Sequence, residues 1–345
     1  MPPPLSRRAA LAGLGAALLT GCGPHVLPTA SPLPTADDDG VRTGSPTPTP
    51  TPTPVPPSPV PRPDITVDAA DGPVTVPGGA RRVVALDTAE LDSAMTLGIT
   101  PVGAAKAPLD AGPPGYWPAS RLAGVAVVGG IGAAPDTAAI TALRPQLILT
   151  NLARDTDHLP ALRAIAPTVA TRTTGAPWKE NFQLHATALD RREQAAAVVA
   201  AYDRHVDQAK AALAAAGAAG QRISLVRFVE GSPAVRLYAR QNFPGSVLAD
   251  LGLPRPGPQD ADRFDTEAAP DQLAPADGDL LLYAGYGDPA RNGLATALAS
   301  PAWRALGAVR AHRAFQVDDQ LWFQGIGYTG AHFLIAELLH VLGAN

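Results

Sequence analysis

Arginine and aromatic side chains at the ends of short apolar segments are the residues of this sequence best suited to bind a ligand. Only 5% of the 345 residues are aromatic, so an aromatic residue near an arginine at such a position is informative. Aromatic faces cover flat apolar groups, and a planar guanidinium addresses paired oxygens without changing its protonation state. The combination predicts a binding site for a ligand that has both kinds of surface.

Three arginines and one tyrosine have such positions. Arg154 follows one apolar run, Arg240 lies at the exit of another, and Tyr286 follows a third, in a loop flanked by glycines. Arg227 lies inside an apolar run, where an unpaired charge would be costly. It must therefore face either a cleft or a partner such as Glu230, and we favour the cleft.

Other chemistries have less support in the sequence. The seven histidines form no close ligand pair, and we expect His205 and His312 at the surface, whereas a zinc or manganese receptor needs three or four converging ligands. There is no Gly-x-Ser-x-Gly motif, and the glycines at 129–132 lack the remaining residues of a nucleotide-binding loop. The net charge of −4 provides no polycationic face for nucleic acid. We expect neither catalysis nor direct metal ligation.

The sole cysteine, Cys22, lies in a segment typical of export signals. Ser-Arg-Arg at 6–8 precedes an apolar stretch at 9–19, and Leu-Thr-Gly-Cys closes the segment at 19–22. This end resembles the lipobox of bacterial lipoproteins, and the paired arginines resemble a twin-arginine signal. We expect residues 1–22 to be a lipoprotein signal peptide and Cys22 to anchor the mature chain on the extracytoplasmic face of the cell membrane. An ordinary cleaved signal is the alternative.

The rest of the chain divides into a tether and two lobes. Residues 23–63 are rich in Pro and Thr, with almost nothing to bury, and should form an extended tether. From there, short apolar runs typical of buried strands alternate with helical segments. The long uninterrupted segment 191–216 favours one helix of about 39 Å. The alternation predicts an α/β fold of two Rossmann-like lobes, with an N-terminal lobe at 64–183, a bridging helix at 184–220 and a C-terminal lobe at 221–345.

Individual elements follow from the same pattern. Strands are expected at 82–86, 101–104, 125–129, 146–150, 168–171, 223–229, 235–239 and 280–284. Helices are expected at 137–143, 157–165, 246–251 and 328–342. Asp87, with Glu90 three residues later, is a plausible capping box for a further helix that ends near 97.

Several short motifs follow one another from about residue 64 to the end of the chain. They are 84–92 (VALDTAELD), 97–103 (LGITPVG), 142–149 (ALRPQLIL), 165–169 (IAPTV), 177–182 (PWKENF), 226–231 (VRFVEG), 240–243 (RQNF), 286–289 (YGDP), 317–319 (VDD) and 321–328 (LWFQGIGY). Their order resembles that of iron-siderophore substrate-binding lipoproteins of ABC importers, and within these the ferric hydroxamate (ferrioxamine-type) receptors.

The resemblance implies a class III periplasmic binding protein, with the ligand in a cleft between the lobes. That ligand would be an Fe(III)-siderophore complex whose iron is already held by oxygen, so neither metal ligands nor a cofactor are expected from the protein. The resemblance assigns ligand binding to Arg154, Trp178, Arg227, Arg240, Asn242, Tyr286, Trp322, Gln324 and Tyr328. Trp322 would be an aromatic platform. Gln324, at a position where such receptors often carry a second aromatic residue, would be a hydrogen-bond donor.

Receptors of this kind dock on their permease through one acidic residue at the top of each lobe. Asp271 matches the second-lobe position, whereas Ala138 stands where a glutamate is commoner in the first lobe, and Asp136 is the candidate substitute. The expected partners are an ABC permease with its ATPase and the membrane at Cys22, and the protein should be a monomer. A cobalamin or haem receptor of the same fold is the main alternative, because a fold does not fix its ligand; a lipid-anchored hydrolase is a more remote one.

Overall fold

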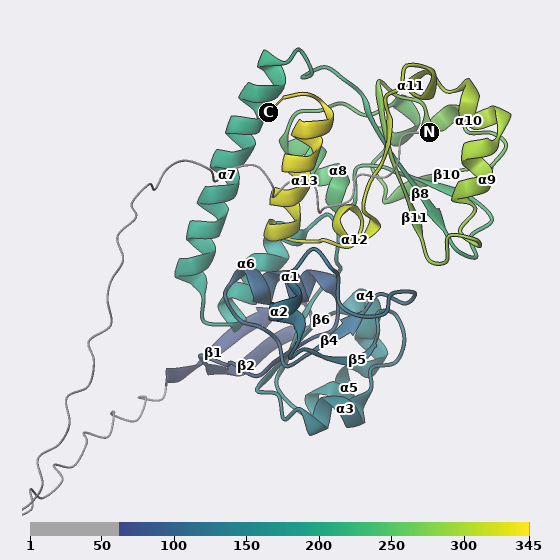
Figure 1. Cartoon of the computed structure of the whole chain (residues 1–345). Coiled ribbons are helices and arrows are strands. Elements are labelled where there is room, and N and C mark those ends of the chain that lie inside the picture. The colour runs from purple at the N-terminus through teal and green to yellow at the C-terminus, as the bar shows by residue number, and fades with distance from the viewer. Residues whose placement is uncertain (1–61, 345) are drawn as a thin grey trace, which may run out of the picture. The chain divides into compact units, whose positions relative to one another are not determined.

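The structure, a computed structural model, describes residues 62–344, which form two α/β lobes and a long helix between them in sequence (Figure 1). The expected signal peptide, Cys22 and the tether up to residue 61 lie outside the described residues. None of the helices in residues 62–344 is long and apolar enough to cross a membrane.

The first lobe is built on a five-stranded sheet of short strands, most of them buried. All its strand pairs are parallel, in the order β5–β4–β3–β6–β7. A parallel sheet is covered by helices on both faces, which is why the inner strands β3 and β6 are fully buried and mostly apolar. The lobe comprises β3 (Val83–Ala85), α1 (Thr88–Thr96), β4 (Gly103–Lys106), α2 (Ala119–Leu122), β5 (Ala126–Gly130), α3 (Thr137–Ala142), β6 (Leu147–Asn151), α4 (Leu152–Asp155), α5 (Leu159–Arg163), β7 (Thr168–Thr171) and α6 (Trp178–Ala188).

The order of these strands reverses between β3 and β6, which are neighbours in the sheet although β4 and β5 lie between them in sequence. Ligands of open parallel sheets bind beyond the carboxyl ends of the strands at such a switch point. Asp87 follows β3, and Arg154 lies in α4, directly after β6. The topology of the first lobe therefore brings these two side chains to the same edge of the sheet.

The second lobe has a mixed sheet in the order β10–β9–β8–β11–β12. Strand β11 pairs in parallel with β8 and β12, whereas β9 is antiparallel to both β8 and β10. The lobe comprises β8 (Ile223–Val229), β9 (Val235–Tyr238), α8 (Phe243–Asp250), β10 (Asp265–Ala268), β11 (Leu280–Tyr286), α9 (Leu294–Ala299), α10 (Pro301–Ala305), α11 (Gly307–Arg310), β12 (Ala314–Gln316), α12 (Asp319–Trp322) and α13 (Tyr328–Val341).

One continuous helix, α7 (Arg192–Ala215), leads from the first lobe to the second. Its 24 residues span about 36 Å. Figure 1 shows α7 and α13 running side by side, and the two helices pack against each other. Their contact gives the long helix a buried face in addition to its own helical propensity.

The N-terminus of α13 is capped by a side chain from the first lobe. The carboxylate of Asp92, in α1, accepts hydrogen bonds from the backbone N–H groups of Thr329 and Gly330, each at 3.3 Å, and from the Tyr116 hydroxyl at 2.8 Å. A carboxylate at this end of a helix also interacts favourably with the helix dipole. Gly327 allows the close approach, because a Cβ there would lie 2.1 Å from Asp92 Oδ1.

The fold class expected from the sequence is confirmed: both lobes are α/β and α7 occupies the segment expected to be one long helix. Residues 184–188, which we grouped with that helix, belong to α6 instead, and the chain turns at Asp190, whose φ is +55°. A hairpin of β1 (Arg62–Ala69) and β2 (Gly72–Gly78) was not expected. Prolines and glycines in β2 conceal its strand pattern.

Candidate ligand-binding site

A cleft lined by residues of both lobes has an empty volume of about 730 Å³, including the solvent space at its mouth. The residues that line it include Asp87, Thr88, Arg154 and Thr174 from the first lobe, and Arg227, Arg236, Tyr238, Asn242, Phe243, Phe264, Tyr286, Phe323 and Gln324 from the second.

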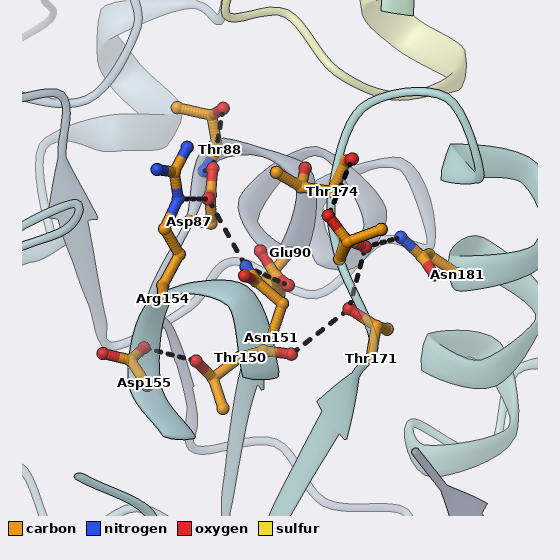
Figure 2. A network of polar contacts seen from close by, with 11 residues as sticks. Asp87, Thr88, Glu90, Thr150, Asn151, Arg154, Asp155, Thr171, Thr174 and Asn181 are labelled. Atoms are coloured by element: carbon orange, nitrogen blue, oxygen red, sulfur yellow. Dashed lines mark hydrogen bonds and ion pairs between the residues drawn. The ribbon is translucent and has the colours of Figure 1, made fainter. Parts of the chain in front are cut away.

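The first-lobe wall is a polar network at the switch point of the sheet (Figure 2). Asp87 Oδ1 accepts from the backbone N–H of Thr88 at 2.7 Å and thereby caps α1. Asp87 Oδ2 accepts from Arg154 Nε and from Asn151 Nδ2, each at 3.4 Å. The same amide nitrogen of Asn151 donates to Glu90 Oε1, also at 3.4 Å. Burial, and after it the charge of Asp87, raises the pKa of Glu90 to about 8, so this side chain is mostly protonated at neutral pH.

The second-lobe wall is organised around Arg227, in β8, which is only 8% exposed. Its Nε and Nη2 donate to the two carboxylate oxygens of Asp319, each at 2.6 Å, and its Nη1 donates to the Tyr238 hydroxyl at 3.1 Å. The guanidinium carbon lies 4.5 Å from the ring centroid of Tyr286 and 5.2 Å from that of Phe323. Burial works against the charged form, but the contacts with Tyr238 and Asp319 outweigh it and raise the pKa of Arg227.

From its position in the sequence, Arg227 was expected to face either a cleft or an acidic partner, and in the structure it does both. It lines the cleft, as we favoured, and it also has an acidic partner, but this partner is Asp319 and not Glu230. Glu230 pairs with Arg291 instead. Gln324, which also lines the cleft, donates to Asp319 Oδ2 at 2.8 Å.

Tyr286 lines the cleft and also joins the two lobes. Its hydroxyl accepts from the backbone N–H of Leu109, in the first lobe, at 2.9 Å. Burial raises the pKa of Tyr286, so the hydroxyl keeps its proton. The same first-lobe loop is held by Gln320, whose side chain accepts from Gly115 N at 2.8 Å and donates to Asp110 Oδ2 at 2.9 Å. Hydrogen bonds of Tyr286 and Gln320 thus connect the second lobe to this loop of the first lobe.

Arg236 is a cleft residue that our sequence reasoning missed. Its closest acidic partner is Asp265, at 3.8 Å, and its buried Nε has no hydrogen-bond partner. Arg236 is a charged residue within the apolar strand expected at 235–239, the same signal that singled out Arg227. Applied to every strand, that signal would have found it.

Trp322 does not line the cleft, contrary to our expectation. Its side chain is fully buried, and its indole N–H donates to Glu337 Oε2 at 2.8 Å. The short helix α12 ends at Trp322 and turns this side chain into the core, where it faces α13, so that its neighbour Phe323 lines the cleft. The segment lines the cleft through Phe323 and Gln324 but not through Trp322.

Trp178 and Tyr328 also lie in the core and not among the lining residues. Both are 2% exposed, and their ring centroids are 4.7 Å apart. The Trp178 indole donates to Ser246 Oγ at 2.8 Å. Phe243, which lines the cleft, packs edge-on against Trp178 with ring centroids 5.6 Å apart. Trp178 thus supports the cleft from the layer beneath it.

Arg240 and Asn242 differ from what their motif suggested. Arg240 lies outside the cleft lining, because its Nη1 pairs with Asp260 at 2.6 Å and both side chains are about half exposed. Asn242 lines the cleft, but its side chain forms hydrogen bonds with backbone groups. Its Oδ1 accepts from Gly245 N at 2.8 Å and caps α8, and its Nδ2 donates to the carbonyl of Phe264 at 2.6 Å.

The two acidic residues suggested for docking are both exposed. Asp136 caps α3 by accepting from Ala139 N at 2.9 Å, and Asp271 lies in the loop after β10.

The histidines give one contact that the sequence did not predict. His205, in α7, and His332, in α13, bring their Nδ1 atoms to 2.7 Å, and burial lowers the pKa of each. Neither is fully exposed. Within residues 62–344, no group of three or more His, Cys, Asp or Glu side chains is arranged to hold a metal ion.

Comparisons with known proteins agree with this architecture. The model of a family described as periplasmic binding protein matches residues 83–321. The probable siderophore-binding lipoprotein YfiY of Bacillus subtilis is 32% identical over 276 residues, which cover 76% of this chain and 82% of the relative. The Fe(3+)-citrate-binding protein YfmC of the same organism is 26% identical over 268 residues, covering 74% and 79%. The crystal structure of Staphylococcus aureus SirA complexed with staphyloferrin B matches with a TM-score of 0.71 at 25% identity, covering 81% of this chain and 98% of that one. This chain belongs to the periplasmic binding protein family.

Proposed function

We propose that this chain captures a ferric siderophore in the cleft between its lobes and delivers it to an ABC permease for iron uptake. The observation that carries the proposal is the setting of Arg227, a guanidinium fixed by Asp319 between the rings of Tyr286 and Phe323. The names of two relatives, a siderophore-binding lipoprotein and a ferric-citrate-binding protein, support iron complexes as the ligand class.

A ferric complex suits this wall because its iron brings its own ligands. The remaining need is to cover the organic part of the chelator and to donate hydrogen bonds to the oxygens around the metal. Tyr238, Tyr286 and Phe323 offer apolar faces. Arg227 offers a planar group of donors that is already oriented before the ligand arrives.

We propose a hydroxamate-type siderophore as the substrate class, on the basis of charge. Each cleft arginine has an aspartate partner: Arg154 with Asp87, Arg227 with Asp319 and Arg236 with Asp265. The walls therefore have little net charge. Three hydroxamates neutralise Fe(III), whereas a tris-catecholate complex is trianionic and should require a more basic cleft.

The test is a fluorescence titration of the purified protein with ferrioxamine, a ferric catecholate, ferric citrate, haem and cobalamin. Trp178 should report binding because it packs against Phe243 at the cleft. We expect ferrioxamine to bind at least tenfold more tightly than the iron-free siderophore and more tightly than the catecholate. Tighter binding of haem or cobalamin than of every ferric siderophore would overturn the proposal.

Ferric citrate is a second candidate because a relative is named for it. It differs from ferrioxamine in the free carboxylates that surround its iron, and Arg236, whose Nε lacks a partner, is the donor suited to them. If ferric citrate is the ligand, Arg236→Gln should weaken its binding about tenfold and leave ferrioxamine binding nearly unchanged.

Delivery would require the chain to be held at the membrane and to dock on a permease. We propose lipidation at Cys22 for the first and the exposed carboxylates of Asp271 and Asp136 for the second. Asp271→Arg should reduce stimulation of the permease-coupled ATPase without changing ligand affinity. Asp260→Arg, on another exposed carboxylate of the second lobe, is the matched control.

A further inference from the structure

At the first-lobe wall, the carboxyl groups of two buried side chains, Asp87 and Glu90, are bridged by the side-chain amide of Asn151 (Figure 2). Asp87 lines the cleft, Glu90 lies in the first turn of α1, and Asn151 Nδ2 donates to a carboxyl oxygen of each at 3.4 Å. The three side chains are at most 2% exposed. Two carboxylates that share one donor so far from solvent repel each other, so this arrangement favours one negative charge over two.

Unpaired atoms in the same network support this conclusion. Glu90 Oε2 and Asn151 Oδ1 are both buried and have no hydrogen-bond partner. Both are acceptors when Glu90 is ionised, and leaving buried acceptors without donors is costly. A proton on Glu90 removes one buried charge and converts one of these acceptors into a donor.

The charged groups that face Glu90 come from both elements packed around it. Asp87, at the start of α1, and Asp155, in α4, both raise the pKa of Glu90. Asp155 is itself hydrogen-bonded to Thr150 and interacts with His158. Arg154 is the cation in contact with this network, through its 3.4 Å contact with Asp87, and its side chain is 42% exposed to the cleft. Arg154 lines the cleft and contacts Asp87, so it links the ligand site to the two carboxyl groups.

We propose that Asp87, Asn151 and Glu90 form a proton store beneath Arg154, so that drawing the Arg154 guanidinium toward a bound ferric complex is accompanied by uptake of a proton from solvent. This inference rests on the proposed function for its ligand. The proton comes from water or buffer and forms an O–H bond on the Asp87–Glu90 pair, and no other bond changes. Asn151 is a positioning residue, because it couples the two carboxyl groups without touching the ligand.

The direction of the pH dependence follows from the charges. In the ligand-free protein, Arg154 offsets part of the repulsion that favours the protonated pair. When Arg154 moves to the ligand, Glu90 holds its proton more strongly and its pKa rises. Binding then takes up protons in the window that begins near pH 8, the pKa of Glu90, and extends above it. Ligand affinity should fall as the pH rises through that window.

The first experiment needs no ligand. The carboxyl carbon of Glu90 is followed by NMR in ¹³C-glutamate-labelled protein between pH 5 and 10, and Glu90→Gln identifies its signal. We expect a midpoint near 8 that rises by about 0.5 unit or more in Arg154→Ala. Arg163→Ala is the matched control, because Arg163 pairs with Asp71 in the same lobe and is 39% exposed. A midpoint below 6, or one that Arg154→Ala leaves unchanged, would overturn the proposal.

The second experiment measures the proton directly during binding. The full chain is titrated calorimetrically with ferrioxamine and with ferric citrate at pH 8 in phosphate and in Tris, whose ionisation enthalpies differ. We expect uptake of about 0.3–0.5 proton per ligand, lost in Glu90→Gln and retained in Arg163→Ala. Binding without proton uptake refutes the coupling but leaves the proposed function intact. If neither complex binds, the proposed function and the coupling fail together, and the ligand-free titration alone decides whether the proton store exists.

Discussion

Arg227 and Arg154, on opposite walls of the cleft, are held in opposite ways. In the second lobe, Arg227 is 8% exposed, is bound through two hydrogen bonds of 2.6 Å to Asp319 and lies between two aromatic rings. In the first lobe, Arg154 is 42% exposed and has one 3.4 Å contact with Asp87. The second wall is preorganised, so it should fix the orientation of a ligand. The first wall is adjustable, so it should respond to the ligand's charge.

Arg227→Ala should have the largest effect because it removes the centre of the rigid wall. It leaves the Asp319 carboxylate, only about a tenth exposed, without its cation, which costs about 3–5 kcal/mol of the free energy of unfolding. We also expect a loss of at least about a hundredfold in ligand affinity. Urea denaturation and calorimetric titration measure the two quantities. Arg240→Ala is the control, since its exposed pair with Asp260 should contribute less than about 1 kcal/mol. Similar losses of stability and ligand affinity in Arg227→Ala and Arg240→Ala would show that the buried arginine is no more important than the exposed one.

Trp322→Ala should be nearly as destabilising but should not affect recognition. Removing a fully buried tryptophan costs about 3–5 kcal/mol. Because the indole does not line the cleft, the molecules that remain folded should bind ligand with affinity within about twofold of the native value. Phe323→Ala, at the adjacent lining position, should instead weaken binding about tenfold. A tenfold loss in Trp322→Ala at full folding would restore our original assignment of that residue to the ligand.

The pH dependence of stability should distinguish the polar first wall. The pKa of Glu90 is raised to about 8 from its ordinary 4.5, so between these values the folded protein binds more protons than the unfolded chain. The contribution of Glu90 to the free energy of unfolding is therefore greatest below about pH 4.5 and is lost as the pH rises to 8. Relative to Glu90→Gln, the native protein should lose about 1.4 kcal/mol per pH unit across the middle of that range.

The comparison with Glu90→Gln is essential because other groups titrate in the same window. Burial lowers the pKa of His185 to about 3, so its contribution to stability is lost as the pH falls below its ordinary value of 6.5 and opposes that of Glu90. His185 is present in both proteins, so its effect cancels in the difference. Equal slopes in the two proteins between pH 5 and 8 would show that Glu90 does not store a proton.

Tyr286→Phe should have the smallest effect. The ring over Arg227 remains, and the loss is the hydroxyl that accepts from Leu109 N. One such hydrogen bond contributes about 1 kcal/mol. We expect a two- to fivefold change in affinity and faster hydrogen exchange at Leu109, measured by NMR. Tyr283→Phe, in the same strand, is the control. A hundredfold loss of affinity in Tyr286→Phe would mean that the hydroxyl contacts the ligand directly.

The fold could be predicted because most strands of the two lobes are short apolar runs and α7 has no glycine or proline inside it. Strands β10 and β12 were not expected, because neither is an apolar run. The hairpin of β1 and β2 could not, since its prolines and glycines obscure the strand signal. Arg154, Arg227 and Tyr286 were located at the cleft from their positions at strand ends or within an apolar strand. Trp322 could not be resolved from Phe323, because adjacent residues of a short helix point in different directions and the sequence does not say which faces the core.

The hydrogen-bond partners of the site residues were harder to predict than the site residues themselves. Asp319 lies 92 positions from Arg227 and Asn151 lies 61 from Glu90, and no local pattern links either pair. Such contacts depend on which strands become neighbours in the sheet. The switch point between β3 and β6 explains why Glu90 and Asn151 meet, but the order of the strands is not written in any one segment.

The cap that Asp92 provides for α13 has a consequence for how the chain matures. Asp92 belongs to the first lobe, yet two of its hydrogen-bond donors come from Thr329 and Gly330, near the end of the chain. During synthesis, Tyr116 and Thr96 of the first lobe can donate to this buried carboxylate early, but its two backbone donors arrive only with the final helix. The two lobes should consequently unfold together in one transition.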